Sequence, residues 1–85
     1  MMWEIQFSKK ADKVIAAMPV KARTRVTDAI EALAVDPFKA QHVKPMTGAD
    51  SRRLRVGDYR VIFRLENDLL IVVIIDIGPR GGIYK

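Results

Sequence analysis

The sequence predicts a small α+β domain, a β-α-α-β-β-β sandwich in which an N-terminal helical hairpin packs on one face of a mainly antiparallel sheet. Three observations predict this class: a short alternating segment at the start, two segments with helical spacing between residues 8 and 36, and three strand-like segments in the second half. The chain has 85 residues, enough for one modest core, so we assign residues 1–85 to a single domain.

The first segment is a strand that leads into a helix. Trp3, Ile5 and Phe7 alternate with polar residues, which predicts a strand over residues 3–7. Ser8 then occupies the N-cap position of a helix, where a hydroxyl accepts a hydrogen bond from the first turn. The apolar stripe that follows at helical spacing consists of Ala11, Val14, Ile15 and Met18.

A second helix begins near Pro19, which either ends the first helix or opens the second. It ends by Asp36-Pro37, because the residue before a proline avoids the helical region. Two helices with one apolar stripe each predict a helical hairpin laid on a sheet. The second stripe consists of Ala22, Val26, Ala29, Ile30 and Leu33.

The second half of the chain reads as a loop followed by three strands. Residues 38–51 have no clear period and are predicted to be the loop. Residues 52–56 and 59–65 alternate and meet at Gly57-Asp58, a dipeptide that favours the turn of a β-hairpin. Residues 69–77 do not alternate and are rich in β-branched side chains, which predicts a strand that is central in the sheet or covered on both faces.

The predicted hairpin separates arginine from apolar side chains. Arg53 and Arg55 share one face of its first strand, and Leu54 and Val56 share the other. In the second strand, Arg60 and Arg64 point the same way as Ile62, while the opposite row is Tyr59, Val61, Phe63 and Leu65. Guanidinium is the side-chain group best shaped to bind phosphate through paired hydrogen bonds.

The net charge of +5 is concentrated around this hairpin. Residues 39–64 contain seven basic and two acidic side chains, whereas the remainder of the chain is balanced. A one-sided excess of this kind predicts a surface that binds a polyanion. The alternative is a solvated strand face on which arginine only maintains solubility.

Several function classes are excluded or disfavoured by composition. The chain has no cysteine, hence no disulfide and no thiolate metal site, and we expect no metal and no cofactor. Its longest apolar run has 7 residues, far below the roughly 20 that cross a bilayer. The N-terminus does not resemble a signal peptide, so we expect a cytoplasmic protein. His42 is the only histidine, and we expect it to have a surface or loop-packing role.

Two motifs carry a family resemblance: RLRVGDYRVIF at residues 53–63 and IGPRGGIYK at residues 77–85. Together with the predicted order of elements, they resemble the RelE/ParE family of toxins from bacterial type II toxin–antitoxin systems. The resemblance covers essentially the whole chain. It implies a small α/β sandwich and one of two activities: RelE-like members cut messenger RNA in the ribosomal A site, and ParE-like members poison DNA gyrase. The chain lacks the H-G-R-R-like ending common in the gyrase poisons, which favours the RelE-like branch.

The resemblance also implies site residues. Arg53 and Arg55 match the basic pair of the RelE-type strand before the turn, although this pair is often lysine in relatives. Arg60 matches the arginine of its Y-R motif, Arg80 the arginine after the last core strand, and Tyr84 the tyrosine near the end. The residue before Arg80 is a proline here, where relatives often have histidine or lysine.

These residue types suit cleavage of RNA by its own 2′-hydroxyl. Tyr84 would take the proton from that hydroxyl, since neighbouring guanidinium groups favour a phenolate. Arg60 and Arg80 would stabilise the negative charge on the phosphorane. The proton donor to the leaving oxygen stays open between Arg80 and the pair Arg53 and Arg55 acting through water. The predicted phosphate-binding residues are Arg52, Arg53, Arg55, Arg64 and Lys44. Without the resemblance, Tyr84 would read as an aromatic residue packing on the sheet.

The sequence thus predicts a ribosome-dependent messenger RNA endonuclease that inhibits translation. Its partners would be the ribosome, messenger RNA and a neutralising cognate antitoxin, with which it would form a hetero-oligomer. The alternatives are a ParE-like gyrase poison and a non-catalytic RNA-binding module that uses only the arginine face.

Overall fold

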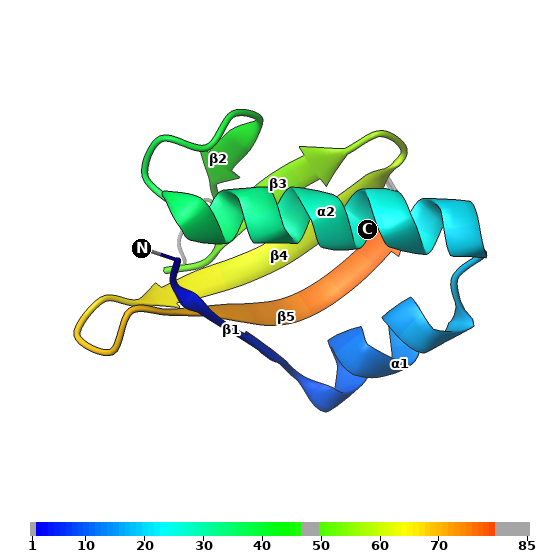
Figure 1. Ribbon diagram of the computed structural model, residues 1–85, viewed down its shortest axis with the longest axis horizontal. Coiled ribbons are helices and arrows are strands. Elements are labelled where there is room, and N and C mark those ends of the chain that lie inside the picture. The colour runs from blue at the N-terminus through cyan, green and yellow to red at the C-terminus, as the bar shows by residue number, and fades with distance from the viewer. Residues whose placement is uncertain (1, 47–49, 80–85) are drawn as a thin grey trace.

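The computed structural model describes residues 2–46 and 50–79 of the chain. Five strands form one mixed sheet with the spatial order β1-β5-β4-β3-β2, and helix α2 lies across it (Figure 1). Strand β1 runs parallel to β5, and all other neighbouring strands are antiparallel. This is the predicted α+β class with a mainly antiparallel sheet. In chain order the elements are β1 (Glu4–Phe7), α1 (Lys9–Ala17), α2 (Val20–Val35), β2 (Val43–Pro45), β3 (Arg52–Val56), β4 (Tyr59–Glu66) and β5 (Ile71–Pro79).

Both helices and the three long strands contribute to one hydrophobic core. Their apolar stripes are buried as the helical spacing predicts, and Phe63 is the largest of the fully buried side chains. Burial of this row removes apolar surface from water on one side of β3, β4 and β5. The buried residues are Ala11 and Met18 of or next to α1; Val26, Ile30, Leu33 and Ala34 of α2; and Leu54, Val61, Phe63, Val72, Ile74 and Ile77 of the sheet.

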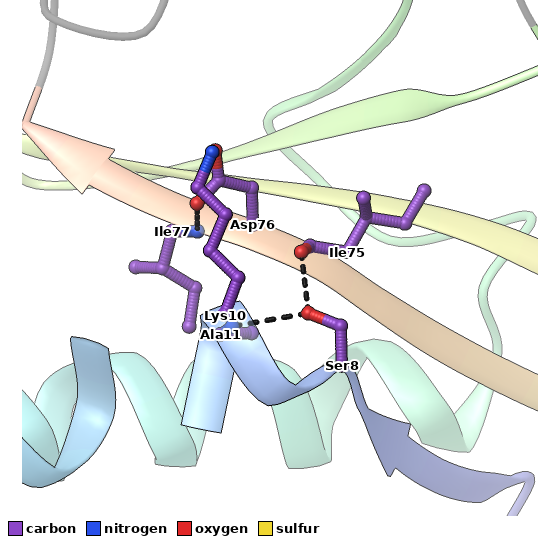
Figure 2. Close-up of polar contacts among 6 residues, drawn as sticks. All are labelled: Ser8, Lys10, Ala11, Ile75, Asp76 and Ile77. Carbon is purple, nitrogen blue, oxygen red and sulfur yellow. Dashed lines mark hydrogen bonds and ion pairs between the residues drawn. The ribbon is translucent and has the colours of Figure 1, made fainter. Parts of the chain in front are cut away.

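Ser8 joins strand β1, helix α1 and strand β5 (Figure 2). Its hydroxyl accepts a hydrogen bond from the Ala11 amide at 3.0 Å, as the predicted N-cap requires, and donates one to the Ile75 carbonyl at 2.6 Å. Its own amide donates to the Ile74 carbonyl at 2.9 Å. The start of α1 is therefore held against the middle of β5.

Strand β5 contains a β-bulge at this same point. Ile62 of β4 lies opposite Asp76, but the next residue, Phe63, lies opposite Ile74, so Ile75 is the extra residue. The bulge places Ile74 and Ile77 on the same buried face although they are three residues apart. It accounts for the missing alternation in residues 69–77, and the predicted central position is confirmed, since β5 lies between β1 and β4.

Asp76, beside the bulge, is held in an ion pair. Its carboxylate lies 3.1 Å from the Lys10 ammonium of α1 and accepts a hydrogen bond from the Ile77 amide at 2.8 Å (Figure 2). The side chain of Asp76 is only 17% exposed. This aspartate therefore links the bulged strand to α1.

Two boundaries of the sequence-based prediction are wrong. Residues 38–51 are not all loop, because Val43–Pro45 forms the edge strand β2 next to β3. Three residues cannot show a period, and a proline is tolerated on an edge strand because its missing N–H faces away from the sheet. Leu69 and Leu70 belong to the turn before β5, where they are 68% and 45% exposed.

The helical hairpin agrees with the prediction at both of its outer ends. Helix α1 begins after Ser8 and α2 ends at Val35, directly before Asp36-Pro37. Pro19 opens α2, which is one of the two predicted alternatives, but as its N-cap and not as its first helical residue. Arg23 of α2 closes the connection, because its guanidinium donates hydrogen bonds to the carbonyls of Ile15, Ala16 and Met18.

We expect Ser8→Ala to lower the free energy of unfolding by about 1–2 kcal/mol, since it removes a helix cap and a part-buried bond to the sheet. Urea titration followed by circular dichroism measures this change. The matched control is Thr24→Ala, which removes an exposed hydroxyl that bonds only within α2 and should change stability by less than about 0.5 kcal/mol. Equal effects of the two changes would show that Ser8 does not connect α1 to β5.

Candidate nucleic-acid interface

The turn at Gly57-Asp58 fixes how the arginines of β3 and β4 face one another. Gly57 has a φ of 56°, and it alone of the two turn residues has a positive φ, which is the pattern of a type II′ hairpin turn. A Cβ at this position would also lie 2.8 Å from the Arg25 guanidinium of α2. The positive φ favours glycine here, and the turn places Arg55 directly opposite Arg60.

The two faces of this hairpin have opposite character, as the sequence predicts. Leu54 and Val61 lie opposite each other and are buried in the core under the helices. Since side chains alternate along a strand, Arg53, Arg55 and Arg60 lie on the other face of the sheet. Lys44 of β2 lies opposite Arg53 and extends the same row.

A pocket of about 380 Å³ opens on this face and is lined by His42, Val43, Lys44, Arg53, Arg55 and Arg60. We call it the basic pocket. Four of its side chains carry permanent positive charge at neutral pH, and they come from three adjacent strands. Like charges directly opposite each other on neighbouring strands repel. A phosphate group in the pocket would neutralise that repulsion and accept hydrogen bonds from several guanidinium groups.

Four of the predicted site residues meet in the basic pocket: Lys44, Arg53, Arg55 and Arg60. Arg60 also lies opposite Gly78, and Tyr59 lies opposite Pro79 at the end of β5. The sequence continues from there to Arg80 and Tyr84, which lie outside the described residues.

Arg52 and Arg64 are placed apart from the basic pocket. They line a second hollow with Phe38, Asp50, Leu65, Glu66 and Asn67. Arg64 pairs with Glu66 at 2.9 Å, and the Arg52 guanidinium lies 5.7 Å from the centre of the Phe38 ring. Phe38 in turn makes an edge-to-face contact with Trp3. These local partners explain how the two arginines are held without a phosphate ligand.

His42 is exposed, in agreement with the surface role predicted for it, and it also lines the basic pocket, which the sequence did not predict. Its φ of 64° is uncommon for a residue other than glycine, although histidine adopts it more readily than most. Its carbonyl accepts a hydrogen bond from the Arg55 amide at 3.0 Å. No signal in the sequence places it here, because its position depends on the pairing of the three-residue strand β2.

Other site types find no support among residues 2–46 and 50–79. No three histidine, cysteine or carboxylate side chains in these ranges come together so that they could hold a metal ion. No helix in the same ranges is both long enough and apolar enough to span a membrane.

Solved toxin structures have the same fold. The RelE–RelB complex from Pyrococcus horikoshii OT3 matches with a TM-score of 0.83 and 25% identity over 96% of this chain and 99% of that one. The RelBE2 toxin–antitoxin complex from Mycobacterium tuberculosis matches with a TM-score of 0.82 and 23% identity over 94% and 100% of the two chains. The isolated RelE toxin from E. coli, at 16% identity, covers 96% of this chain and 90% of its own, with a TM-score of 0.79.

Sequence comparison gives the family. No curated protein matches the chain significantly. The family model described as "ParE toxin of type II toxin-antitoxin system, parDE" matches residues 3–84, nearly the full length. The family model confirms the predicted resemblance to the RelE/ParE toxins, and the solved RelE toxins share the fold. The chain therefore belongs to the ParE toxin family of type II toxin–antitoxin systems and is built on the fold of the RelE toxins.

Proposed function

We propose that this toxin is a ribosome-dependent endonuclease that cuts messenger RNA and so inhibits translation. The observation that carries the proposal is the basic pocket, in which Lys44, Arg53, Arg55 and Arg60 converge from three strands on one face of the sheet. An RNA strand carries one phosphate per nucleotide, and clustered guanidinium groups bind phosphate with both charge and paired hydrogen bonds.

The proposed chemistry is attack of the RNA 2′-oxygen on the neighbouring phosphorus. Arg60 and Arg80 stabilise the negative charge that develops on the phosphorane, and Tyr84 takes the proton from the 2′-hydroxyl. Arg53 and Arg55 hold the phosphate backbone. The pairing of Arg60 with Gly78 supports this grouping, because Arg80 follows two residues later in the chain.

Dependence on the ribosome follows from what the pocket lacks. Four of the six described residues that line it are lysine or arginine, and none is Phe, Tyr or Trp, so it offers no large aromatic side chain on which bases could stack. Cleavage by the 2′-oxygen requires that oxygen, the phosphorus and the leaving 5′-oxygen to lie in line. A ribosome that holds the messenger RNA in this geometry supplies the positioning. In well-oriented reactions, positioning lowers the activation free energy by up to about 7–11 kcal/mol.

We also propose that a cognate antitoxin neutralises this toxin by covering the basic pocket. Solved relatives from Pyrococcus horikoshii, Mycobacterium tuberculosis and E. coli are complexes of toxin and antitoxin. A partner that contributes acidic side chains or an apolar helix next to them would complement the charge of the pocket. Toxin and antitoxin then form a hetero-oligomer, and both act in the cytoplasm, where ribosomes translate.

Purified toxin should cut messenger RNA on programmed ribosomes and leave the same RNA intact without ribosomes, as mapping of RNA 5′ ends would show. Arg80→Ala and Tyr84→Phe should each slow cleavage by about 100-fold or more, because they remove charge stabilisation and proton transfer. Lys21→Ala changes a lysine of α2 that does not line the basic pocket and should cut normally. Uncut RNA under conditions in which an active RelE toxin cuts would reject the proposal.

Gyrase poisoning is the second candidate, because the matching family model is that of the ParE toxins. A gyrase poison would inhibit supercoiling of plasmid DNA, and Tyr84→Phe would not relieve that inhibition, since no RNA proton is transferred. The two candidates thus differ both in target and in their dependence on Tyr84.

The salt dependence of the RNA-binding constant measures how many phosphate contacts the basic pocket makes. Arg55→Gln should make the slope of log K against log salt less steep by about 0.7 for single-stranded RNA, because one phosphate contact is lost. The control variant Arg64→Gln also removes one positive charge, but this arginine is already paired with Glu66. The salt slope of this variant should therefore stay near that of the unchanged protein. Fluorescence titration at several KCl concentrations measures both. Equal slopes for the two variants would contradict a phosphate site centred on the basic pocket.

A further inference from the structure

We propose that His42 is the general acid of the cleavage reaction and gives its proton to the leaving 5′-oxygen of the RNA. The inference rests on the proposed endonuclease function and deepens it. It assigns the proton donor, a role for which the arginines of the site are chemically unsuited.

The composition of the basic pocket singles out this histidine. The charged groups that line the pocket together with it are Lys44 from β2, Arg53 and Arg55 from β3, and Arg60 from β4. Guanidinium groups stay protonated throughout the accessible pH range, and an ammonium group ordinarily does so up to about pH 10. Among the described residues that line the pocket, only His42 carries a side chain of the type that exchanges protons near neutral pH.

The backbone holds His42 at a defined place beside the arginines. Its carbonyl accepts the Arg55 amide at 3.0 Å, and the next residue, Val43, lies opposite Leu54 in the β2–β3 ladder. The left-handed conformation of His42, with φ 64°, turns the chain into β2 at this point. Unusual backbone conformations of this kind cluster at functional sites, where the surrounding structure keeps them in place. The imidazole itself is exposed, so a bound RNA can reach it.

The reaction balances with His42 in this role. The 2′-oxygen forms a bond to phosphorus, the bond from phosphorus to the 5′-oxygen breaks, and the products are a 2′,3′-cyclic phosphate and a 5′-hydroxyl. The proton of the 2′-hydroxyl passes to the base, Tyr84 in the proposed function. The imidazolium of His42 passes its N–H proton to the 5′-oxygen as that bond breaks. The proton taken up by Tyr84 then returns through solvent to the neutral imidazole, which restores both groups.

A substrate with sulfur in place of the bridging 5′-oxygen tests the role directly. A thiolate leaves without being protonated, because thiols are far stronger acids than alcohols. The key variant is His42→Asn, since asparagine also tolerates the left-handed backbone but transfers no proton. On programmed ribosomes, we expect this variant to cut the oxygen-bridged messenger RNA about 100-fold more slowly than the unchanged toxin. It should cut the sulfur-bridged RNA at nearly the same rate as the unchanged toxin.

Each other outcome overturns the assignment in a distinguishable way. The control variant Gln41→Asn changes the exposed neighbouring residue and should cut both substrates at the rate of the unchanged toxin. This result would show that a substitution in this turn does not by itself slow cleavage. An equal loss by His42→Asn on both substrates means that His42 only positions the RNA, and no loss on either means that it takes no part. If the unchanged toxin cuts neither substrate, the endonuclease function itself fails and the role of His42 fails with it.

Discussion

The register between strands β3 and β4 is the constraint on which the rest of this structure depends. It places Leu54 opposite Val61 in the core and, one residue further along, Arg55 opposite Arg60 on the other face. A slip of one residue would exchange the two faces, burying guanidinium groups and exposing the apolar row. Hydrophobic burial on one side of the hairpin thus fixes the geometry of the cations on the other, and the turn at Gly57 sets that register.

The basic pocket gathers like charges on adjacent strands. Like charges repel each other, and a bound anion reduces that repulsion. Any ligand that binds only the folded state stabilises it. In the proposed function, RNA and an acidic antitoxin would therefore compete for the same electrostatic stabilisation.

Much of this fold is predictable from the sequence, and the exceptions have physical causes. The N-cap at Ser8, the end of α2 before Pro37 and the hairpin turn at Gly57 each depend on local chemistry, so single residues reveal them. Strand β2 and the bulge in β5 are set by pairing with distant residues, which leaves no local pattern. The convergence of Arg53, Arg55 and Arg60 followed from strand alternation, whereas the place of His42 depended on β2 and stayed hidden.

Parallel pairing of β1 with β5 brings residues 4–7 next to residues 71–74. The first strand therefore has no strand partner until residues 71–74 have been synthesised, and contacts so distant in sequence form slowly. During synthesis the core remains open on the side that β1 and β5 close, with apolar helix faces uncovered. This side of the core therefore closes only once residues 71–74 can pair with residues 4–7. This delay gives a partner protein time to bind the newborn chain first.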